Sequence, residues 1–305
     1  MDLLARQSHF RNNREIFFIT LPGVLYTLLF AYVPMIGIII AFKKYRYDEG
    51  IFGSEWVGWS NFEFLFASSD AWRIIRNTIG YNLVYTITVT VSALLFALLL
   101  NEIRQRFVKV YQTVLFLPYF ISTVLVGYIV YAFLEANNGY LNRVLESFGL
   151  PGRMWYAETK PWLFILPTVN LWHGVGFATL VYYAGIMGIG SDYYEAAKLD
   201  GASRIQMMYR ITLPLLTPLI MILLILSIGN MIRGDFGLHY FVPQNSTLVL
   251  STTDIIDTYV VRALQTIGDV GMSAAVGFFQ SVTGLILVIT ANAIVRKIND
   301  ENSLF

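Results

Sequence analysis

Six long apolar stretches constrain this chain more than any other feature of its sequence. They cover residues 16–42, 77–100, 110–134, 161–187, 213–232 and 272–295. About 20 consecutive apolar residues allow a helix to cross the hydrocarbon core of a bilayer, where a helix satisfies its own backbone hydrogen bonds. The sequence therefore predicts an all-α, multi-pass membrane protein with six transmembrane helices.

The composition agrees with this class and excludes others. Charged residues make up 13% of the 305 residues, whereas a soluble domain averages about 25%. The net charge of +1 gives no reason to expect a nucleic-acid partner. The chain has no cysteine, which excludes disulfides, thiol catalysis and thiolate metal sites.

The distribution of Lys and Arg predicts the orientation in the membrane. With a cytoplasmic N-terminus, the inner segments carry 11 of these residues in 59 positions and the outer loops carry 10 in 99. The inner segments are 1–15, 101–109, 188–212 and 296–305, and the outer loops are 43–76, 135–160 and 233–271. Because cytoplasmic loops are enriched in Lys and Arg, we expect both termini in the cytoplasm.

The apolar stretches contain no Asp, Glu, Lys or Arg. Ion-coupled carriers place such groups at membrane depth despite their cost, so this chain has little with which to use an ion gradient. It also has no phosphate-binding G-x-x-x-x-G-K-[ST] loop. His9, His173 and His239 are far apart and predict no metal site. We expect a chain that is not an enzyme and binds no cofactor itself, so that a partner must supply energy for uphill transport.

A polar, small-residue stretch, residues 191–218, separates the fourth and fifth apolar stretches. Two pairs have the spacing of a capping box: Asp192 with Glu195, and Ser203 with Gln206. Gly201 suits the left-handed end of a first short helix, and Pro214 suits the first turn of the next. The pattern predicts a capped helical hairpin, which either docks a partner or is an ordinary solvated loop.

The hairpin resembles the EAA signature of permease subunits of binding-protein-dependent ABC importers. The matching residues are Glu195-Ala196-Ala197, Asp200-Gly201-Ala202 and Ile211-Thr212-Leu213-Pro214. Met208 departs from the pattern, since many members carry an aromatic residue there. The N-terminal stretch from Asn13-Arg14-Glu15 through Pro22-Gly23 to Lys43-Lys44-Tyr45 looks like the sugar-permease branch, similar to permeases for polysaccharide fragments in Gram-positive bacteria.

The resemblance implies the ABC transporter type I permease fold. Residues 1–73 would form a cytoplasmic segment, the first transmembrane helix and an outer loop, with that helix wrapping a neighbouring subunit. Residues 74–294 would form the permease core and 295–305 a cytoplasmic tail. The implied function is ATP-driven uptake of a carbohydrate, an oligosaccharide, across a bacterial cell membrane.

The resemblance also implies the partners. They are a second, non-identical permease subunit, a cytoplasmic ABC ATPase dimer that binds ATP and Mg, an extracellular solute-binding lipoprotein and membrane lipid. The hairpin would be the coupling helix that sits in a groove of the ATPase, with Glu195 pairing a basic residue there. The coupling residues implied are Glu195, Ala196, Ala197, Asp200, Gly201, Ala202, Met208, Leu213 and Pro214.

Polar and aromatic residues inside the apolar stretches are candidates for the substrate path, because sugars are held by hydrogen bonds and by stacking on aromatic rings. They are Asn82, Tyr85, Asn170, Trp172, His173, Tyr182, Asn230 and Gln280. Each has a structural alternative, since buried amides commonly tie membrane helices together. Asn230, Arg233 and Asp235 either gate the outer mouth of the path or simply mark the interface. The loop 233–271 is long enough to help dock an external binding protein.

Two other classes stay open at this stage. A channel or secondary carrier for a small neutral solute is also multi-pass, although the hairpin has no role in it. A membrane-embedded enzyme such as a lipid-linked glycosyltransferase needs paired acidic residues near the interface, whereas Glu135, Glu158 and Asp235 are scattered.

Overall fold

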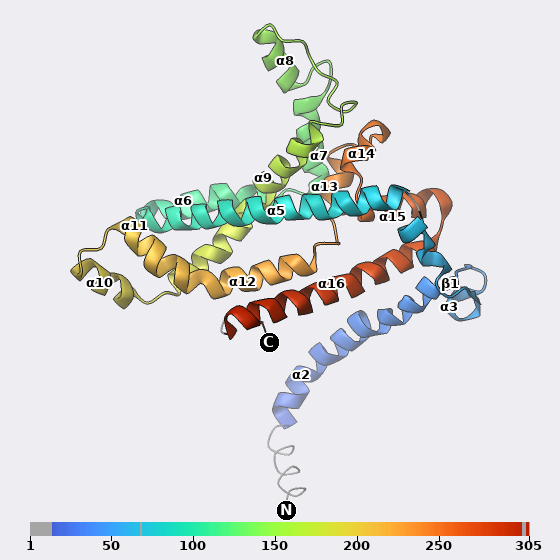
Figure 1. Cartoon of the computed structure of the whole chain (residues 1–305), viewed down its shortest axis with the longest axis horizontal. Coiled ribbons are helices and arrows are strands. Elements are labelled where there is room, and N and C mark those ends of the chain that lie inside the picture. Colours follow the sequence, from blue (N-terminus) through green and yellow to red (C-terminus); the bar gives the residue numbers. More distant parts are fainter. Residues whose placement is uncertain (1–13, 68, 301–302, 305) are drawn as a thin grey trace, which may run out of the picture.

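The computed structural model describes residues 14–67, 69–300 and 303–304, which are almost entirely helical (Figure 1). The predicted cytoplasmic segment before Arg14, including His9 and Asn13, lies outside the described residues. The long helices are α2 (Arg14–Thr27) with its continuations η1 (Leu28–Tyr32) and η2 (Val33–Phe42), α5 (Ser69–Glu102), α9 (Trp162–Met187), α12 (Leu213–Gly229) and α16 (Val270–Ile298).

Shorter elements connect these helices. Before α5 lie β1 (Lys43–Lys44), α3 (Gly50–Gly53), β2 (Glu55–Trp56), η3 (Ser60–Phe62) and α4 (Glu63–Ala67). Between α5 and α9 lie α6 (Gln105–Phe116), η4 (Leu117–Phe120), α7 (Thr123–Leu134) and α8 (Tyr140–Ser147). The hairpin contains α10 (Ser191–Leu199), α11 (Arg204–Met207) and the π-helix η5 (Met208–Thr212). Before α16 lie α13 (Phe236–Phe241), η6 (Thr247–Val249), α14 (Leu250–Thr253) and α15 (Ile256–Ile267). The two strands pair antiparallel, with Lys43 opposite Trp56.

Five of the six predicted spans are confirmed as helices long and apolar enough to cross a membrane. Among the described residues they are Ile16–Phe42, Asp70–Glu102, Trp162–Met187, Arg204–Gly229 and Val270–Ile298. The prediction of one helix over 110–134 is wrong, because Arg106–Phe120 and Thr123–Leu134 meet at an angle of 95°. Only as a bent pair do these two helices make a sixth span.

Local chemistry explains the break. Pro118 lacks the N–H that a continuing helix needs and lies in the tight turn η4. Ser122 then caps α7 by accepting a hydrogen bond from the Leu125 N–H. The carbonyl of Ile121 at the break accepts a hydrogen bond from His173 Nε2 at 2.9 Å. A side chain of α9 therefore satisfies a backbone group that the break leaves without a helical partner.

Helix α9 packs at the centre of the body. Buried side chains join it to α5 and α12: Ala93, Ala97, Val175, Tyr182, Ile186 and Leu216. Gly176 lies so close to α6 that a Cβ there would overlap the backbone of Leu115. Small residues allow membrane helices to approach at this distance, so α6 and α9 are fixed against each other at the backbone.

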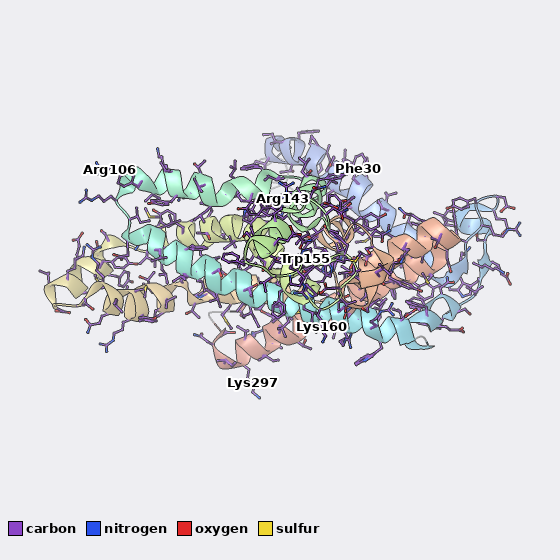
Figure 2. All side chains as sticks on the ribbon, turned by 90° about the horizontal axis from the view of Figure 1, so that it is seen from above. Phe30, Arg106, Arg143, Trp155, Lys160 and Lys297 are labelled. Atoms are coloured by element: carbon purple, nitrogen blue, oxygen red, sulfur yellow. The ribbon has the colours of Figure 1, made fainter. Side chains whose placement is uncertain are left out.

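Helix α2 and η1 stand apart from this body (Figure 1), whereas η2 packs against α16, where Ala41 is buried and Phe42 contacts Phe278. Only 6% of the apolar window of this first span is buried, and Phe30, labelled in Figure 2, is 68% exposed. A contiguous apolar surface of this extent needs lipid or another protein around it. The first span therefore has the exposed character expected of a helix in a membrane.

The loop around α8 projects from the body as a separate unit (Figure 1). Asn142 is buried within it and donates from Nδ2 to the carbonyls of Ala136 and Arg153 at 2.8 and 2.9 Å. Its Oδ1 accepts from Trp155 Nε1 at 2.8 Å. A buried amide with this many partners holds its loop in one shape. Asn142 thus orders the part of the loop around α8. Tyr156 ties the loop to the body, because its Oη donates to the Val242 carbonyl at 3.4 Å and its own carbonyl accepts from Ser246 Oγ at 2.9 Å.

Candidate functional site: the hairpin and the central cavity

The predicted hairpin between α9 and α12 is present, and its turn is built as expected. Gly201 has a φ of +76°, the left-handed region that suits glycine. Ser203 caps α11 by accepting from the Gln206 N–H at 3.3 Å, and Gln206 Oε1 accepts from the Ser203 N–H at 2.8 Å. This confirms the capping box predicted for Ser203 and Gln206.

The other predicted capping box, Asp192 with Glu195, is wrong. Helix α10 begins at Ser191, so Gly190 occupies the N-cap position and no side chain caps the helix. Asp192 lies inside the first turn instead. An acidic residue there still favours the helix, because its charge opposes the positive end of the helix dipole.

Pro214 lies in the first turn of α12, as predicted, although this helix continues directly from the second arm of the hairpin. The helix runs from Arg204 to Gly229 without a break, and the π-helical segment Met208–Thr212 directly precedes Pro214. Pro214 has no N–H to donate to the carbonyl of Arg210, four residues earlier. A wider local turn is a common way to accommodate such a defect. The second arm of the hairpin is therefore the first part of the fifth span.

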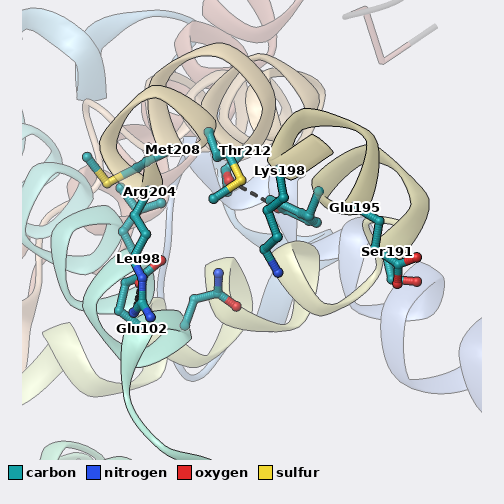
Figure 3. A pocket seen from close by; sticks show the side chains of 11 residues that line it. Leu98, Glu102, Ser191, Glu195, Lys198, Arg204, Met208 and Thr212 are labelled. Carbon is teal, nitrogen blue, oxygen red and sulfur yellow. Dashed lines mark hydrogen bonds and ion pairs between the residues drawn. The ribbon is translucent and has the colours of Figure 1, made fainter. Parts of the chain in front are cut away.

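Two contacts hold the hairpin together and to the body. Tyr194 Oη and Thr212 Oγ1 lie 3.0 Å apart and link its two arms. Arg204 Nη1 lies 2.8 Å from Glu102 Oε2 at the end of α5. Both partners of this ion pair are exposed, so it contributes at most about 1 kcal/mol. Between these contacts lies a cavity of about 520 Å³, into which Lys198 extends (Figure 3). These contacts therefore stabilise the position of the hairpin on the rest of the chain only weakly.

The hairpin presents apolar side chains outward. Leu199 is 90% exposed, and Tyr193, Ile205 and Tyr209 are also exposed. Glu195 is exposed and takes part in no ion pair within the described part of the chain. Of the other implied coupling residues, Ala196, Asp200, Gly201 and Pro214 are exposed, and Ala197, Ala202, Met208 and Leu213 are partly buried. All nine lie together on this hairpin and at its junction with α12.

A second cavity, of about 360 Å³, lies between α5, α9 and α12. Four of the predicted substrate-path residues line it: Asn82, Tyr85, Tyr182 and Asn230. Thr86, Thr90 and Ser227 add hydroxyl groups, Phe177 adds an aromatic ring, and Arg233 is the one charged residue in the lining. We call this space the central cavity.

The other four predicted substrate-path residues do not line the central cavity. His173 bonds the Ile121 carbonyl at the break between η4 and α7. Gln280 Nε2 donates to the carbonyl of Ile232 at 3.0 Å and to Asp257 Oδ2 at 3.2 Å. Asn170 is partly buried and Trp172 is exposed. For His173 and Gln280 the structural alternative, a tie between segments, is the one present.

Two buried polar groups near the cavity had no signal in the sequence. His239 is buried and its Nδ1–H donates to the Thr253 carbonyl at 2.8 Å, so its Nε2 accepts from Tyr85 Oη at 3.0 Å. Burial lowers the pKa of His239 to about 4, which keeps the ring neutral. Asp254 is buried beneath Arg262, with Oδ2 2.6 Å from its guanidinium. The sequence places these partners in separate loops and helices, so no local spacing reveals them.

Five spans and one bent pair, with a capped hairpin at one end, define a multi-pass, all-α membrane protein. No group of three His, Cys, Asp or Glu in the described part of the chain is placed to hold a metal ion. The chain belongs to the family of binding-protein-dependent transport system inner membrane components, whose model matches residues 90–300. This confirms the resemblance seen at the hairpin.

Two relatives of known name cover most of the chain. The polygalacturonan/rhamnogalacturonan transport system permease protein YteP of Bacillus subtilis (strain 168) is 38% identical over 298 residues, which are 94% of this chain and 89% of YteP. Protein LplB of the same strain is 34% identical over 292 residues, 95% of this chain and 91% of LplB.

A solved structure confirms the type I permease fold. It is a chain of a bacterial ABC transporter involved in the import of the acidic polysaccharide alginate, with a TM-score of 0.85 and 32% identity. The match covers 97% of this chain and 99% of that one. A structure of a bacterial alginate ABC transporter in complex with its alginate pentasaccharide-bound periplasmic protein matches with a TM-score of 0.83. These matches support the importer and give no support to a channel or secondary carrier.

Proposed function

We propose that this chain is the permease through which an ATP-driven importer takes up an oligosaccharide delivered by an extracellular solute-binding protein. The central cavity carries the proposal, because its lining combines amide and hydroxyl groups with aromatic rings, as sugar recognition requires. The relatives support the substrate class: YteP is named for polygalacturonan and rhamnogalacturonan, and the structural neighbour takes part in alginate import.

The hairpin would be the docking point for a separate cytoplasmic ABC ATPase dimer. Its exposed Leu199 and Tyr193 offer apolar anchors, and Glu195 offers a charge that no residue of the described chain neutralises at close range. Interfaces concentrate their energy in such apolar anchors and in desolvated charge pairs. ATP and Mg would bind to that ATPase, and this chain would hold no cofactor of its own.

The remaining partners and the topology belong to the same proposal. A second, non-identical permease subunit would cover the exposed face of α2, and a solute-binding lipoprotein would dock on the opposite side from the hairpin. If the bent pair counts as one span, α2 begins and α16 ends on the side of the hairpin. Both termini would then be cytoplasmic in a bacterial cell membrane. We also propose the division into residues 1–73, a permease core at 74–294 and a tail at 295–305.

Uptake and complex assembly, measured together, test the hairpin. The variants Glu195→Arg and Gly201→Asp are expressed in cells that lack the chromosomal gene. Each should abolish uptake of a labelled oligosaccharide. Each should also no longer retain the ATPase when this chain is purified in detergent. Both variants should be present in the membrane at wild-type levels, because the contacts between the hairpin and the body contribute little to the stability of the fold. Lys297→Glu, at an exposed position near the end of α16, is the control and should leave both readouts unchanged. Normal uptake in both hairpin variants would contradict the proposal.

A further inference from the structure

Arg233 stands out in the central cavity because it is the one charged residue of its lining. It is exposed, and in the described part of the chain it makes no ion pair within 4.0 Å and no side-chain hydrogen bond. Arginine at the end of a membrane helix often only reaches toward the interface. Here, however, its side chain borders a space already lined by sugar-compatible groups.

The backbone around Arg233 is fixed from several directions. Asn82 Nδ2 on α5 donates to the Arg233 carbonyl at 3.0 Å, and the Arg233 N–H donates to the Asn230 carbonyl at 3.0 Å. The next N–H, of Gly234, donates to the buried carboxylate of Asp257 at 2.7 Å. The backbone that carries the guanidinium is therefore held in place, while the guanidinium itself stays available to pair with an anion.

Two acidic residues lie close to Arg233, and the positive charge of Arg233 acts on one of them, Asp257. Both carboxylates also accept hydrogen bonds from other groups. Asp257 Oδ2 accepts from Gly234 and from Gln280, and Asp235 Oδ1 caps α13 by accepting from the Leu238 N–H at 3.0 Å. Neither residue lines the cavity. Within the cavity itself, the only formal charge is therefore the positive charge of Arg233.

We infer that Arg233 binds the carboxylate of a uronic acid in the transported oligosaccharide, so that the central cavity selects acidic over neutral sugars. This rests on the proposed function. A carboxylate entering a largely apolar space loses hydration at high cost unless it is paired. A guanidinium matches it with two parallel hydrogen bonds. The amides and hydroxyls of the cavity then serve the sugar hydroxyl groups, which an acidic and a neutral sugar share.

The cavity places the charge at one end. Leu223, Leu226, Ser227 and Asn230 line it along one face of α12, and Arg233 follows beyond the end of that helix. From Leu223 to Asn230 the helix rises about 10 Å. The lining thus changes from apolar to amide to cationic along this wall. A carboxylate would be held at the Arg233 end, with the rest of the sugar chain beside the polar and aromatic groups.

The test compares an acidic oligosaccharide with its neutral analogue in the complete transporter. Tetragalacturonate and its methyl ester share the same ring hydroxyls and differ in charge. Their uptake into proteoliposomes is measured for wild type, Arg233→Gln and Arg233→Lys. Discrimination by the solute-binding protein is common to all three, so it cancels when their acid-to-ester ratios are compared.

We expect Arg233→Gln to lower uptake of the acid about tenfold or more, as for loss of a charge-assisted hydrogen bond, and to leave the ester within about twofold. Arg233→Lys keeps the positive charge but loses the planar guanidinium, so its uptake of the acid should lie between that of the wild type and that of Arg233→Gln. Arg143→Gln on α8 removes another exposed arginine and is the matched control. Unchanged acid uptake in Arg233→Gln, or equal loss of acid and ester, would overturn the assignment. If the wild type transports the acid but not the ester, the two variants are compared by their uptake of the acid alone. Equal loss of acid uptake in Arg233→Gln and Arg233→Lys would then overturn the assignment. Failure of the wild type to carry either sugar would count against the proposed function instead.

Discussion

The turn at Gly201 offers the sharpest test of how the hairpin works. Its φ of +76° is costly for any residue with a Cβ, whereas no atom lies within 4 Å of the position that a Cβ would take. Substitution therefore strains the backbone without a steric clash. The penalty for a residue with a Cβ in this conformation is about 1–2 kcal/mol. Asparagine tolerates it better than alanine, and a β-branched residue tolerates it least.

A strain of this size matters because little else closes the hairpin. One hydrogen bond joins Tyr194 to Thr212, and the ion pair of Arg204 with Glu102 is exposed. A loss of 1–2 kcal/mol shifts the population of the closed turn by about 5- to 30-fold. The apparent affinity for a partner that binds only the closed form falls by the fraction that remains closed. We therefore expect ATPase binding to weaken in the order Gly, Asn, Ala, Val, by up to about 30-fold for Val.

The assay titrates purified ATPase onto variants of this chain in detergent and measures uptake in parallel. Gly149→Val is the matched control, because Gly149 has a φ of +74° and equally open surroundings but lies beyond α8, in the loop away from the hairpin. It should carry the same backbone strain and leave ATPase affinity unchanged. Wild-type affinity in Gly201→Val would refute the reasoning, and so would equal losses for Asn and Val.

Three further predictions follow from local contacts. Ser203→Ala should weaken the hairpin by about 1 kcal/mol, seen as faster amide exchange over 203–207. Asp192→Ala should leave exchange over 203–207 unchanged, because Asp192 lies in the first turn of α10 and caps no helix. Gly176→Ala should reduce the yield of monodisperse protein in detergent, because the new Cβ would overlap the Leu115 backbone. His239 has a pKa lowered from 6.5 to about 4, so the unfolded chain binds its proton first and stability falls as pH drops from about 6.5 to about 4. The free energy of unfolding should fall by about 3 kcal/mol over this range. The melting temperature, measured as a function of pH, should show this fall. In His239→Gln the melting temperature should depend less on pH.

The sequence predicted what depends on local pattern. Long apolar stretches identified five spans and located both arms of the bent sixth one. Spacing alone identified the cap at Ser203 and the left-handed Gly201. In both cases the interaction joins residues at most three positions apart or a residue with its own backbone, so the sequence itself contains the relevant geometry.

The errors have a common physical origin. In residues 110–134 the sequence stays hydrophobic through Pro118 and Ser122, so it looks like one helix. The chain nevertheless changes direction there, because Pro118 ends the first helix and Ser122 caps the second. At Asp192 the capping-box spacing is present, but Gly190 begins the helix, and the pattern gives no indication of that register. Capping patterns specify a helix end only together with the backbone conformation of the cap residue.

The substrate-path prediction divided along similar lines. Asn82, Tyr85, Tyr182 and Asn230 line the central cavity, whereas His173 and Gln280 lie outside it and bond to backbone carbonyls of distant segments. Asn82 does both, because its Nδ2 also donates to the carbonyls of Met231 and Arg233. Residue type could not separate the two groups, because an amide serves a sugar and a carbonyl equally well. What decides is whether the side chain also borders an open space between helices, and that is a tertiary property.

The central cavity and the hairpin are joined by two continuous helices. Helix α9 lines the cavity with Phe177 and Tyr182 and ends at Met187, four residues before α10 begins. The helix from Arg204 to Gly229 starts in the hairpin and lines the cavity with Leu223 and Ser227. A partner that moves the hairpin therefore acts on both of these walls. Helix α5, the third wall, is packed on α9 through the buried side chains of Ala93, Ala97 and Val175. Motion of α12 relative to the packed pair of α5 and α9 would change the width of the cavity, which is how a hairpin without catalytic groups could control access to the proposed sugar site.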